Sequence, residues 1–82
     1  MDKNKIFEII VTHAREVIPS LATHQFKITE TLKELGANSL DRSDISMMTL
    51  ETLSVRTALV DLARANNIGE LVDILHEELQ KK

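Results

Sequence analysis

Apolar residues recur at three- and four-residue steps near both ends of the chain, and this spacing restricts the fold more than any other feature. Side chains at these steps share one face of an α-helix. The first pattern predicts a helix from about Lys3 to Val17, closed by Pro19. The second predicts a helix that Asn67 caps and that continues to about Gln80. Each helix needs a partner that covers its apolar face, so the two ends predict a helical domain.

The middle of the chain predicts a long loop and a further helix. Residues 21–35 carry apolar residues without a clean period, which indicates a loop that is pinned to the core at intervals. Gly36 can take the positive φ of a tight turn, and Asn38 or Ser39 is a preferred N-cap residue. We therefore expect a helix to begin there and to run to about Thr52.

A short helix is expected before the last one. After a break at residues 54–55, the stretch from about Thr57 to Ala65 places Leu59, Leu62 and Ala63 inward. The four helices together predict an all-α fold, a small four-helix bundle with three longer helices and one short. A chain of 82 residues suffices for one domain and not for two, so residues 1–82 are expected to form a single domain.

The composition fits packed helices around a modest core. Apolar residues make up 43% of the chain but aromatic residues only 2%, so Leu, Ile, Val, Met and Ala must fill the interior. Leu, Glu, Lys and Ala are also good helix formers. A domain of this size has little interior to spare for an enclosed active site, which argues against a self-sufficient enzyme.

Charge and residue usage argue against several classes of function. The formal charge is -3 and no basic stripe with interleaved aromatics is present, so we expect no nucleic-acid partner. Cysteine is absent, which excludes disulfides, thiolate metal sites and a cysteine nucleophile. His13, His24 and His76 share no metal-ligand spacing, so no metal site is expected. The start of the chain is neither a secretory signal nor a membrane span, which makes a cytoplasmic protein the expectation.

The stretch from Leu35 to Arg42 places Ser39 at the first turn of a helix, behind a glycine turn. Unpaired backbone N–H groups and the positive end of the helix dipole stabilise negative charge there, so the position suits a phosphodiester. The alternative is that Asn38 and Ser39 are ordinary capping residues, and spacing alone favours that interpretation. No adjacent histidine base or Gly-x-Ser-x-Gly turn accompanies Ser39, so a catalytic serine is not expected.

These residues resemble the attachment motif of acyl carrier proteins, in which a Gly-x-Asp-Ser-Leu run opens the second of four helices. Here the run reads Gly36-Ala37-Asn38-Ser39-Leu40. The likeness covers nearly the whole chain, including the long first loop and the last helix. The resemblance implies an acyl-carrier-protein-like bundle in which Ser39 accepts a 4'-phosphopantetheine arm from coenzyme A. It also implies a protein that is a substrate and partner of enzymes and has no catalytic residues of its own.

Two departures from the common family pattern indicate a particular set of partners. Asn38 replaces the usual aspartate before the serine, and Leu50 stands where an acid is expected. The chain most resembles the discrete carriers of bacterial polyketide synthase β-branching cassettes. Their family role is to donate an acetyl unit, made from a malonyl-loaded carrier by decarboxylation, to a hydroxymethylglutaryl synthase-like enzyme. The implied partners of this monomeric carrier are a phosphopantetheinyl transferase, an acyltransferase, a ketosynthase-like decarboxylase and that synthase-like enzyme.

The resemblance also assigns partner recognition to residues that follow Ser39. They are two apolar and four charged residues of the second predicted helix: Leu40, Asp41, Arg42, Asp44, Met47 and Glu51. Apolar helix residues such as Leu40, Met47 and Leu50 are more often core residues than contacts, and charged ones are more often a solvated face. The alternatives for the whole chain are a fatty-acid carrier, a D-alanyl carrier and an unmodified helical interaction domain.

Overall fold

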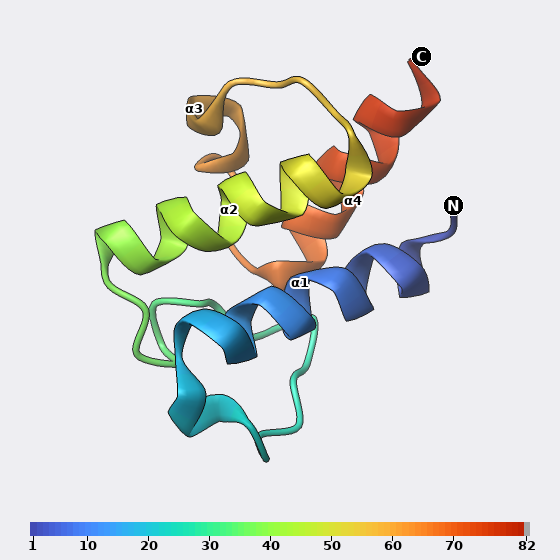
Figure 1. The fold of residues 1–82 in the computed structure, drawn as a ribbon. Coiled ribbons are helices and arrows are strands. Elements are labelled where there is room, and N and C mark those ends of the chain that lie inside the picture. The colour runs from blue at the N-terminus through green and yellow to red at the C-terminus, as the bar shows by residue number, and fades with distance from the viewer. Residues whose placement is uncertain (82) are drawn as a thin grey trace.

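The computed structural model describes residues 1–81 and builds them almost entirely from helices joined by loops (Figure 1). Three helices are long and one is short, as the sequence predicts. In chain order the elements are α1 (Lys3–Val17), the 3-10 turn η1 (Pro19–Leu21), α2 (Ser39–Leu53), α3 (Leu59–Leu62) and α4 (Ile68–Gln80). The bounds of α1 and α4 are those that the apolar periodicity predicts.

Side-chain caps explain where the three long helices begin. Asp2 accepts the Lys5 backbone N–H at 2.8 Å at the start of α1, and Asn67 accepts the Glu70 N–H at 2.8 Å at the start of α4. Each cap satisfies one of the N–H groups that a helix leaves unpaired at its first turn. At its other end α2 stops at Ser54, whose φ of 54° is left-handed.

Helix α3 is shorter than the range of about Thr57 to Ala65 that the sequence predicts. It covers only Leu59–Leu62, because the backbone of Ala58 is extended and supplies no side-chain cap. The segment is held by packing instead, since Leu62 is 4% exposed and belongs to the core. The prediction that Leu59 and Ala63 also point inward is wrong, because Leu59 is 38% exposed and Ala63 is exposed as well. A one-turn helix of this kind depends on tertiary contacts more than on its own hydrogen bonds.

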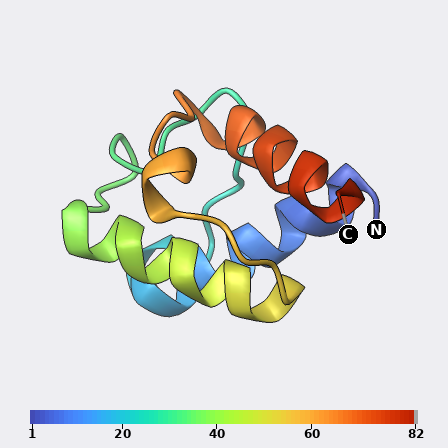
Figure 2. The same cartoon turned by 90° about the horizontal axis from the view of Figure 1, so that it is seen from above.

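The core lies where α1 packs against both α2 and α4, and α3 contacts both of these helices at another edge of the bundle (Figure 2). The largest fully buried side chains come from all three long helices: Ile6, Ile10, Ile45, Thr49, Ile68 and Leu75. Burying one such aliphatic side chain contributes roughly 1.5–3 kcal/mol. Apart from Thr49, the most deeply buried side chains are aliphatic, as the composition predicts.

The long loop between η1 and α2 is fixed to the start of α4. The backbone N–H groups of Ile68 and Gly69 donate to the carbonyls of Glu30 and Ile28 at 2.9 and 2.8 Å. A Cβ at Gly69 would lie 3.2 Å from the Cβ and the carbonyl oxygen of Ile28, so glycine permits this close approach. Leu32 is buried in the core, which confirms that the loop is pinned at intervals.

A polar cluster closes the first part of the same loop. The Glu30 carboxylate accepts the Lys27 N–H at 2.6 Å and lies 3.0 Å from His24 Nε2. The backbone hydrogen bond from Lys27 lowers the pKa of the Glu30 carboxyl, desolvation opposes this, and His24 adds to the lowering. Arg15 donates to the His24 carbonyl at 2.9 Å, which ties the loop to α1.

None of the helices in residues 1–81 combines the length and the hydropathy that a bilayer-spanning segment requires.

Candidate functional site

Ser39 is the first residue of α2, and its side chain is exposed. The turn before it is rigid, because Gly36 takes a φ of +100° and Ala37 is 3% exposed in the core. The Ala37 N–H donates to the Leu32 carbonyl at 3.0 Å, which fixes the turn to the long loop. The fold therefore holds the serine hydroxyl at a defined and accessible point on the surface.

The cap of α2 is Asn38 and not Ser39. The Asn38 side-chain oxygen accepts the Asp41 N–H at 2.8 Å, and the Asp41 carboxylate accepts the Asn38 N–H at 3.2 Å. This reciprocal capping box satisfies two donors at the start of the helix. Asn38 thus performs the capping task that an aspartate would perform there, and the Ser39 oxygen is left for other chemistry.

The start of α2 fits the phosphodiester of a phosphopantetheine arm. Within residues 1–81, the backbone N–H groups of Ser39 and Leu40 have no hydrogen-bond partner. Such free donors and the positive end of the helix dipole stabilise an anion. The exposed hydroxyl, the free N–H groups and the rigid turn together suit a covalent phosphate ester on Ser39.

A cleft of about 430 Å³ opens beside Ser39, between α2 on one side and α3 with the start of α4 on the other. The α2 wall presents Ser39, Arg42, Ser43 and Ser46. The opposite wall presents Leu59 and Leu62 of α3, aliphatic residues that follow them, and the amides of Asn66 and Asn67 before α4. One wall is thus polar and the other mainly aliphatic, so the cleft can hold a molecule that is polar along one side. Ser43 and Ser46 were not among the residues that the sequence singled out, because serines on a helix carry no periodic signal.

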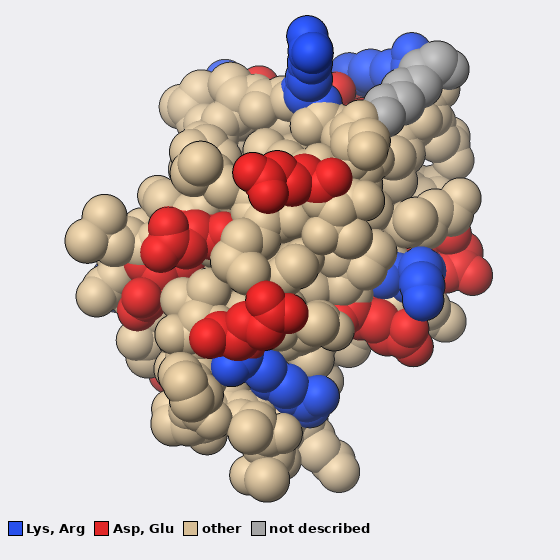
Figure 3. All heavy atoms as spheres, viewed as in Figure 1, with Lys and Arg blue, Asp and Glu red and all other residues tan. Residues whose placement is uncertain are grey.

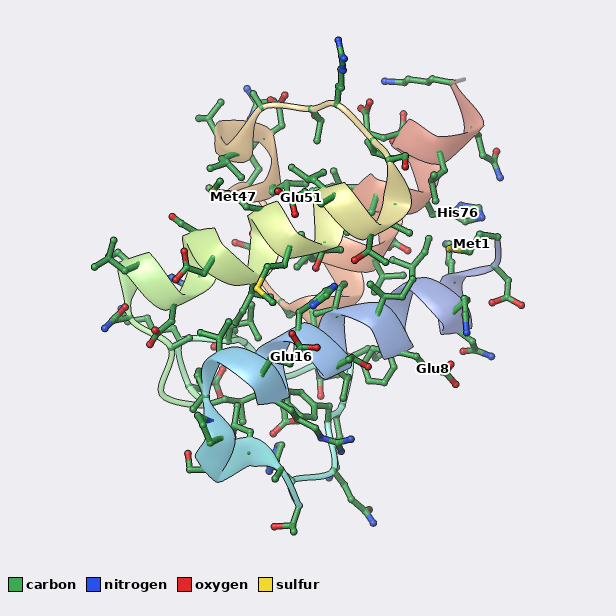
Figure 4. The ribbon with its side chains drawn as sticks, in the orientation of Figure 1. Met1, Glu8, Glu16, Met47, Glu51 and His76 are labelled. Carbon is green, nitrogen blue, oxygen red and sulfur yellow. The ribbon has the colours of Figure 1, made fainter. Side chains whose placement is uncertain are left out.

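The predicted recognition residues divide between two faces of α2. Leu40, Asp44, Met47 and Glu51 follow one another at four- and three-residue steps and form an exposed row, which we call the α2 ridge. Leu40 is 75% exposed and Met47 50%, so the interpretation of these two as core residues is wrong. Figure 4 shows Met47 and Glu51 along the same edge of α2.

The other two predicted recognition residues lie off the α2 ridge. Arg42 lines the cleft, and Asp41 is half-buried and is used in the capping box. Leu50 packs against the core, as its interpretation as a core residue predicts. The sequence did not single out Val60 of α3, which is 67% exposed and adds to the apolar surface near the cleft.

The face that Figure 3 shows carries separated acidic side chains over α1 and α2, with broad uncharged areas between them. Asp44 and Glu51 contribute two exposed carboxylates to the α2 ridge. A partner that meets this ridge needs apolar surface for Leu40 and Met47 and basic groups for the acids. No three His, Cys, Asp or Glu side chains in the described part of the chain are grouped so that they could hold a metal ion.

Comparison with known proteins identifies the class. The family model described as phosphopantetheine attachment site matches residues 8–75. The chain therefore belongs to the phosphopantetheine-binding acyl carrier protein family, whose members are carriers and not catalysts. When bound, 4'-phosphopantetheine supplies a terminal thiol that holds acyl groups as thioesters, which this chain without cysteine could not provide itself.

One curated protein and one solved structure are similar to nearly the whole chain. The chain is 44% identical over 80 residues to the polyketide biosynthesis acyl-carrier-protein AcpK of Bacillus subtilis (strain 168), covering 98% of both chains. It also matches a chain in the crystal structure of the curacin biosynthetic pathway HMG synthase in complex with acetyl donor-ACP. That match has a TM-score of 0.87 and 40% identity and covers 92% of this chain and 96% of the other. Because 82 residues can cover 96% of another chain only if that chain is about as short, the matched chain is the ACP of that complex and not the synthase.

Proposed function

We propose that this chain is a stand-alone acyl carrier of polyketide biosynthesis that delivers acetyl units for β-branching, with its arm on Ser39. The observation that carries the proposal is the likeness to a carrier crystallised as the acetyl donor of an HMG synthase. Coverage of 98% of both chains in the comparison with AcpK supports a single carrier domain over residues 1–82. A malonyl-loaded form would precede the acetyl form, because decarboxylation of malonyl yields the acetyl unit.

The proposed partners follow from this role. A phosphopantetheinyl transferase would modify Ser39, an acyltransferase would load the arm, and a ketosynthase-like decarboxylase would convert malonyl to acetyl. A hydroxymethylglutaryl synthase-like enzyme would then receive the acetyl group. We propose that the carrier meets each of them as a cytoplasmic monomer, with no part for nucleic acid or membrane.

The α2 ridge is the proposed contact surface for these enzymes. Leu40 and Met47 would enter apolar depressions of the partner, and Asp44 and Glu51 would pair with basic groups at the rim of the interface. Apolar anchors mainly set how long a complex lasts, whereas rim charges mainly set how fast it forms. Arg42 and Asp41 border the ridge and remain proposed recognition residues.

The test is acetyl transfer from the loaded carrier to an HMG synthase-like enzyme, followed by mass spectrometry of both proteins. We expect transfer from the acetyl form of the wild type. Met47→Ala should slow transfer, and Ile28→Ala, which truncates an equally apolar residue that is 58% exposed on the long loop, should not. A carrier that transfers no acetyl group but is loaded with long fatty acyl chains or with D-alanine would overturn the proposal in favour of another carrier class.

Two charge-reversal variants distinguish recognition by the α2 ridge from a general effect of net charge. Glu51→Lys should lower the transfer rate at low salt and lose its effect as salt rises, because rim charges steer association. Glu8→Lys makes the same change on α1, away from the α2 ridge, and should leave the rate unchanged (Figure 4). Equal effects of the two variants would exclude the α2 ridge as the contact surface.

A further inference from the structure

The cleft beside Ser39 contains a single charged side chain. Arg42 lies on its α2 wall, and the rest of its lining consists of serine, asparagine and aliphatic residues without a carboxylate. Ser39 lines the same cleft one helical turn before Arg42. A positive group without a counter-charge thus stands beside the hydroxyl that would become a negatively charged phosphodiester.

The sequence of α2 also places no acidic residue one helical turn from Arg42. Residues one turn away along a helix are the ones that can pair with it, and here the positions three and four before and after Arg42 are Asn38, Ser39, Ile45 and Ser46. The nearest carboxylate in sequence, that of Asp41, accepts the Asn38 N–H. Arg42 makes no ion pair with any residue in the part of the chain that the structure describes.

We propose that Arg42 is the counter-ion of the phosphodiester on Ser39 and that this pairing directs the arm along the cleft between α2 and α3. The proposal rests on the proposed attachment at Ser39. A guanidinium binds phosphate oxygens through charge-assisted hydrogen bonds, and its planar donors can engage two oxygens at once. It would act together with the free N–H groups of Ser39 and Leu40 at the start of the helix.

Tethering makes such a contact favourable although it is partly exposed. The phosphate would be joined to residue 39 and Arg42 is part of the same helical turn, so pairing is intramolecular and costs no association entropy. The arm would leave Ser39 with its first segment held near the α2 wall, where Ser43 and Ser46 offer hydroxyls and Leu59 and Leu62 offer apolar surface opposite. Arg42 is thus a positioning residue for the arm.

A double-mutant cycle between arm and arginine tests the pairing. The full chain is prepared without the arm and with the arm, as wild type, Arg42→Gln and Arg56→Gln, and urea unfolding gives the stability of each form. Arg56 is exposed in the segment after α2 and does not line the cleft, so it is the matched control. We expect the arm to raise the free energy of unfolding of the wild type and of Arg56→Gln equally. For Arg42→Gln the increase should be about half as large or less.

A spectroscopic measurement on the wild type needs no variant. The Arg42 side-chain Nε–H signal should shift when the arm is added, and the Arg56 signal should not. Equal stabilisation of all three chains together with an unshifted Arg42 signal would overturn the pairing. Intact mass shows which proposal has failed. A chain that gains no arm overturns the proposed function as well as the pairing. A chain that gains the arm without any effect on Arg42 overturns the pairing alone.

Discussion

Asn38 and Asp41 each accept the backbone N–H of the other, at 2.8 and 3.2 Å, and Ser39 lies between them in the first turn of α2. The hydroxyl that would carry the arm is therefore held inside a closed capping box and does not take part in it. This arrangement keeps the helix start rigid while the serine stays accessible. It also gives a physical role to the asparagine that replaces the family's usual aspartate.

Removing the cap should weaken the protein without removing its attachment point. Asn38→Ala removes the side-chain oxygen that accepts the Asp41 N–H and so breaks the capping box. We expect a loss of about 1 kcal/mol in the free energy of unfolding. Asn38→Asp retains the acceptor oxygen and should lose much less. Urea unfolding of the three chains measures this, and equal stability of Asn38→Ala and the wild type would contradict the role of the cap.

The glycine turn before the site should not tolerate a side chain. Gly36 has a φ of +100°, and a Cβ there would meet nothing within 4 Å, so the cost of Gly36→Ala is one of backbone strain alone. We expect it to lower the free energy of unfolding by about 1–2 kcal/mol. Gly36→Asn should cost less than Gly36→Ala, because asparagine enters positive φ more readily. The reverse order in thermal or urea unfolding would exclude backbone strain as the cause.

Two threonines on α2 should respond oppositely to valine. The Thr52 hydroxyl donates to the Met48 carbonyl at 2.9 Å, so its oxygen accepts from His13 Nε2 at 2.7 Å across the contact between α1 and α2. The His13 Nδ1 is buried without a hydrogen-bond partner and lies 3.7 Å from a Glu16 carboxylate oxygen, so Thr52→Val leaves the ring without a hydrogen bond. We expect a loss of about 1 kcal/mol in the free energy of unfolding.

Thr49→Val is the matched control for this prediction. Thr49 is 1% exposed, but its hydroxyl donates only to the Ile45 carbonyl in the same helix, at 2.7 Å. Such local back-bonding adds little stability, so valine should preserve or raise the free energy of unfolding. A larger loss for Thr49→Val than for Thr52→Val would show that the bond between the helices is unimportant.

The loop cluster should make stability depend on acid. The pKa of Glu30 is lowered from its ordinary value of 4.5, chiefly by the Lys27 backbone hydrogen bond, so the carboxylate stabilises the fold above that pH. The contribution disappears as the pH falls through the lowered pKa. We expect Glu30→Gln to be less stable than the wild type near neutral pH, and the difference to shrink below pH 4.5. An unchanged difference across this range, measured by urea unfolding, would contradict the assignment.

Local signals in the sequence accounted for the long helices and not for the short one. Periodicity and capping residues fix α1, α2 and α4, because both depend on neighbours within a turn or two. Helix α3 has no side-chain cap and is held by Leu62 in the core, and such tertiary contacts cannot be read from spacing. The range that the sequence predicted for it was accordingly too long.

The candidate site was recognisable only in part. The sequence placed Ser39 at a helix start but could not decide whether it or Asn38 is the cap, because both residues are good caps. The structure assigns the cap to Asn38. Likewise, the apolar residues of α2 cover more than one stripe, so the exposure of Leu40 and Met47 and the place of Arg42 in the cleft depend on where α3 packs.

The attachment of the arm to Ser39 is tested most directly by mass spectrometry of the purified chain after incubation with coenzyme A and a phosphopantetheinyl transferase. Ser43 lies one turn further along α2 and lines the same cleft, so Ser43→Ala is the control for Ser39→Ala. The wild type and Ser43→Ala should each gain one arm, fragmentation should place it on Ser39, and Ser39→Ala should gain none. A wild type that stays unmodified while a known carrier is loaded, or an arm found on another residue, would contradict the account.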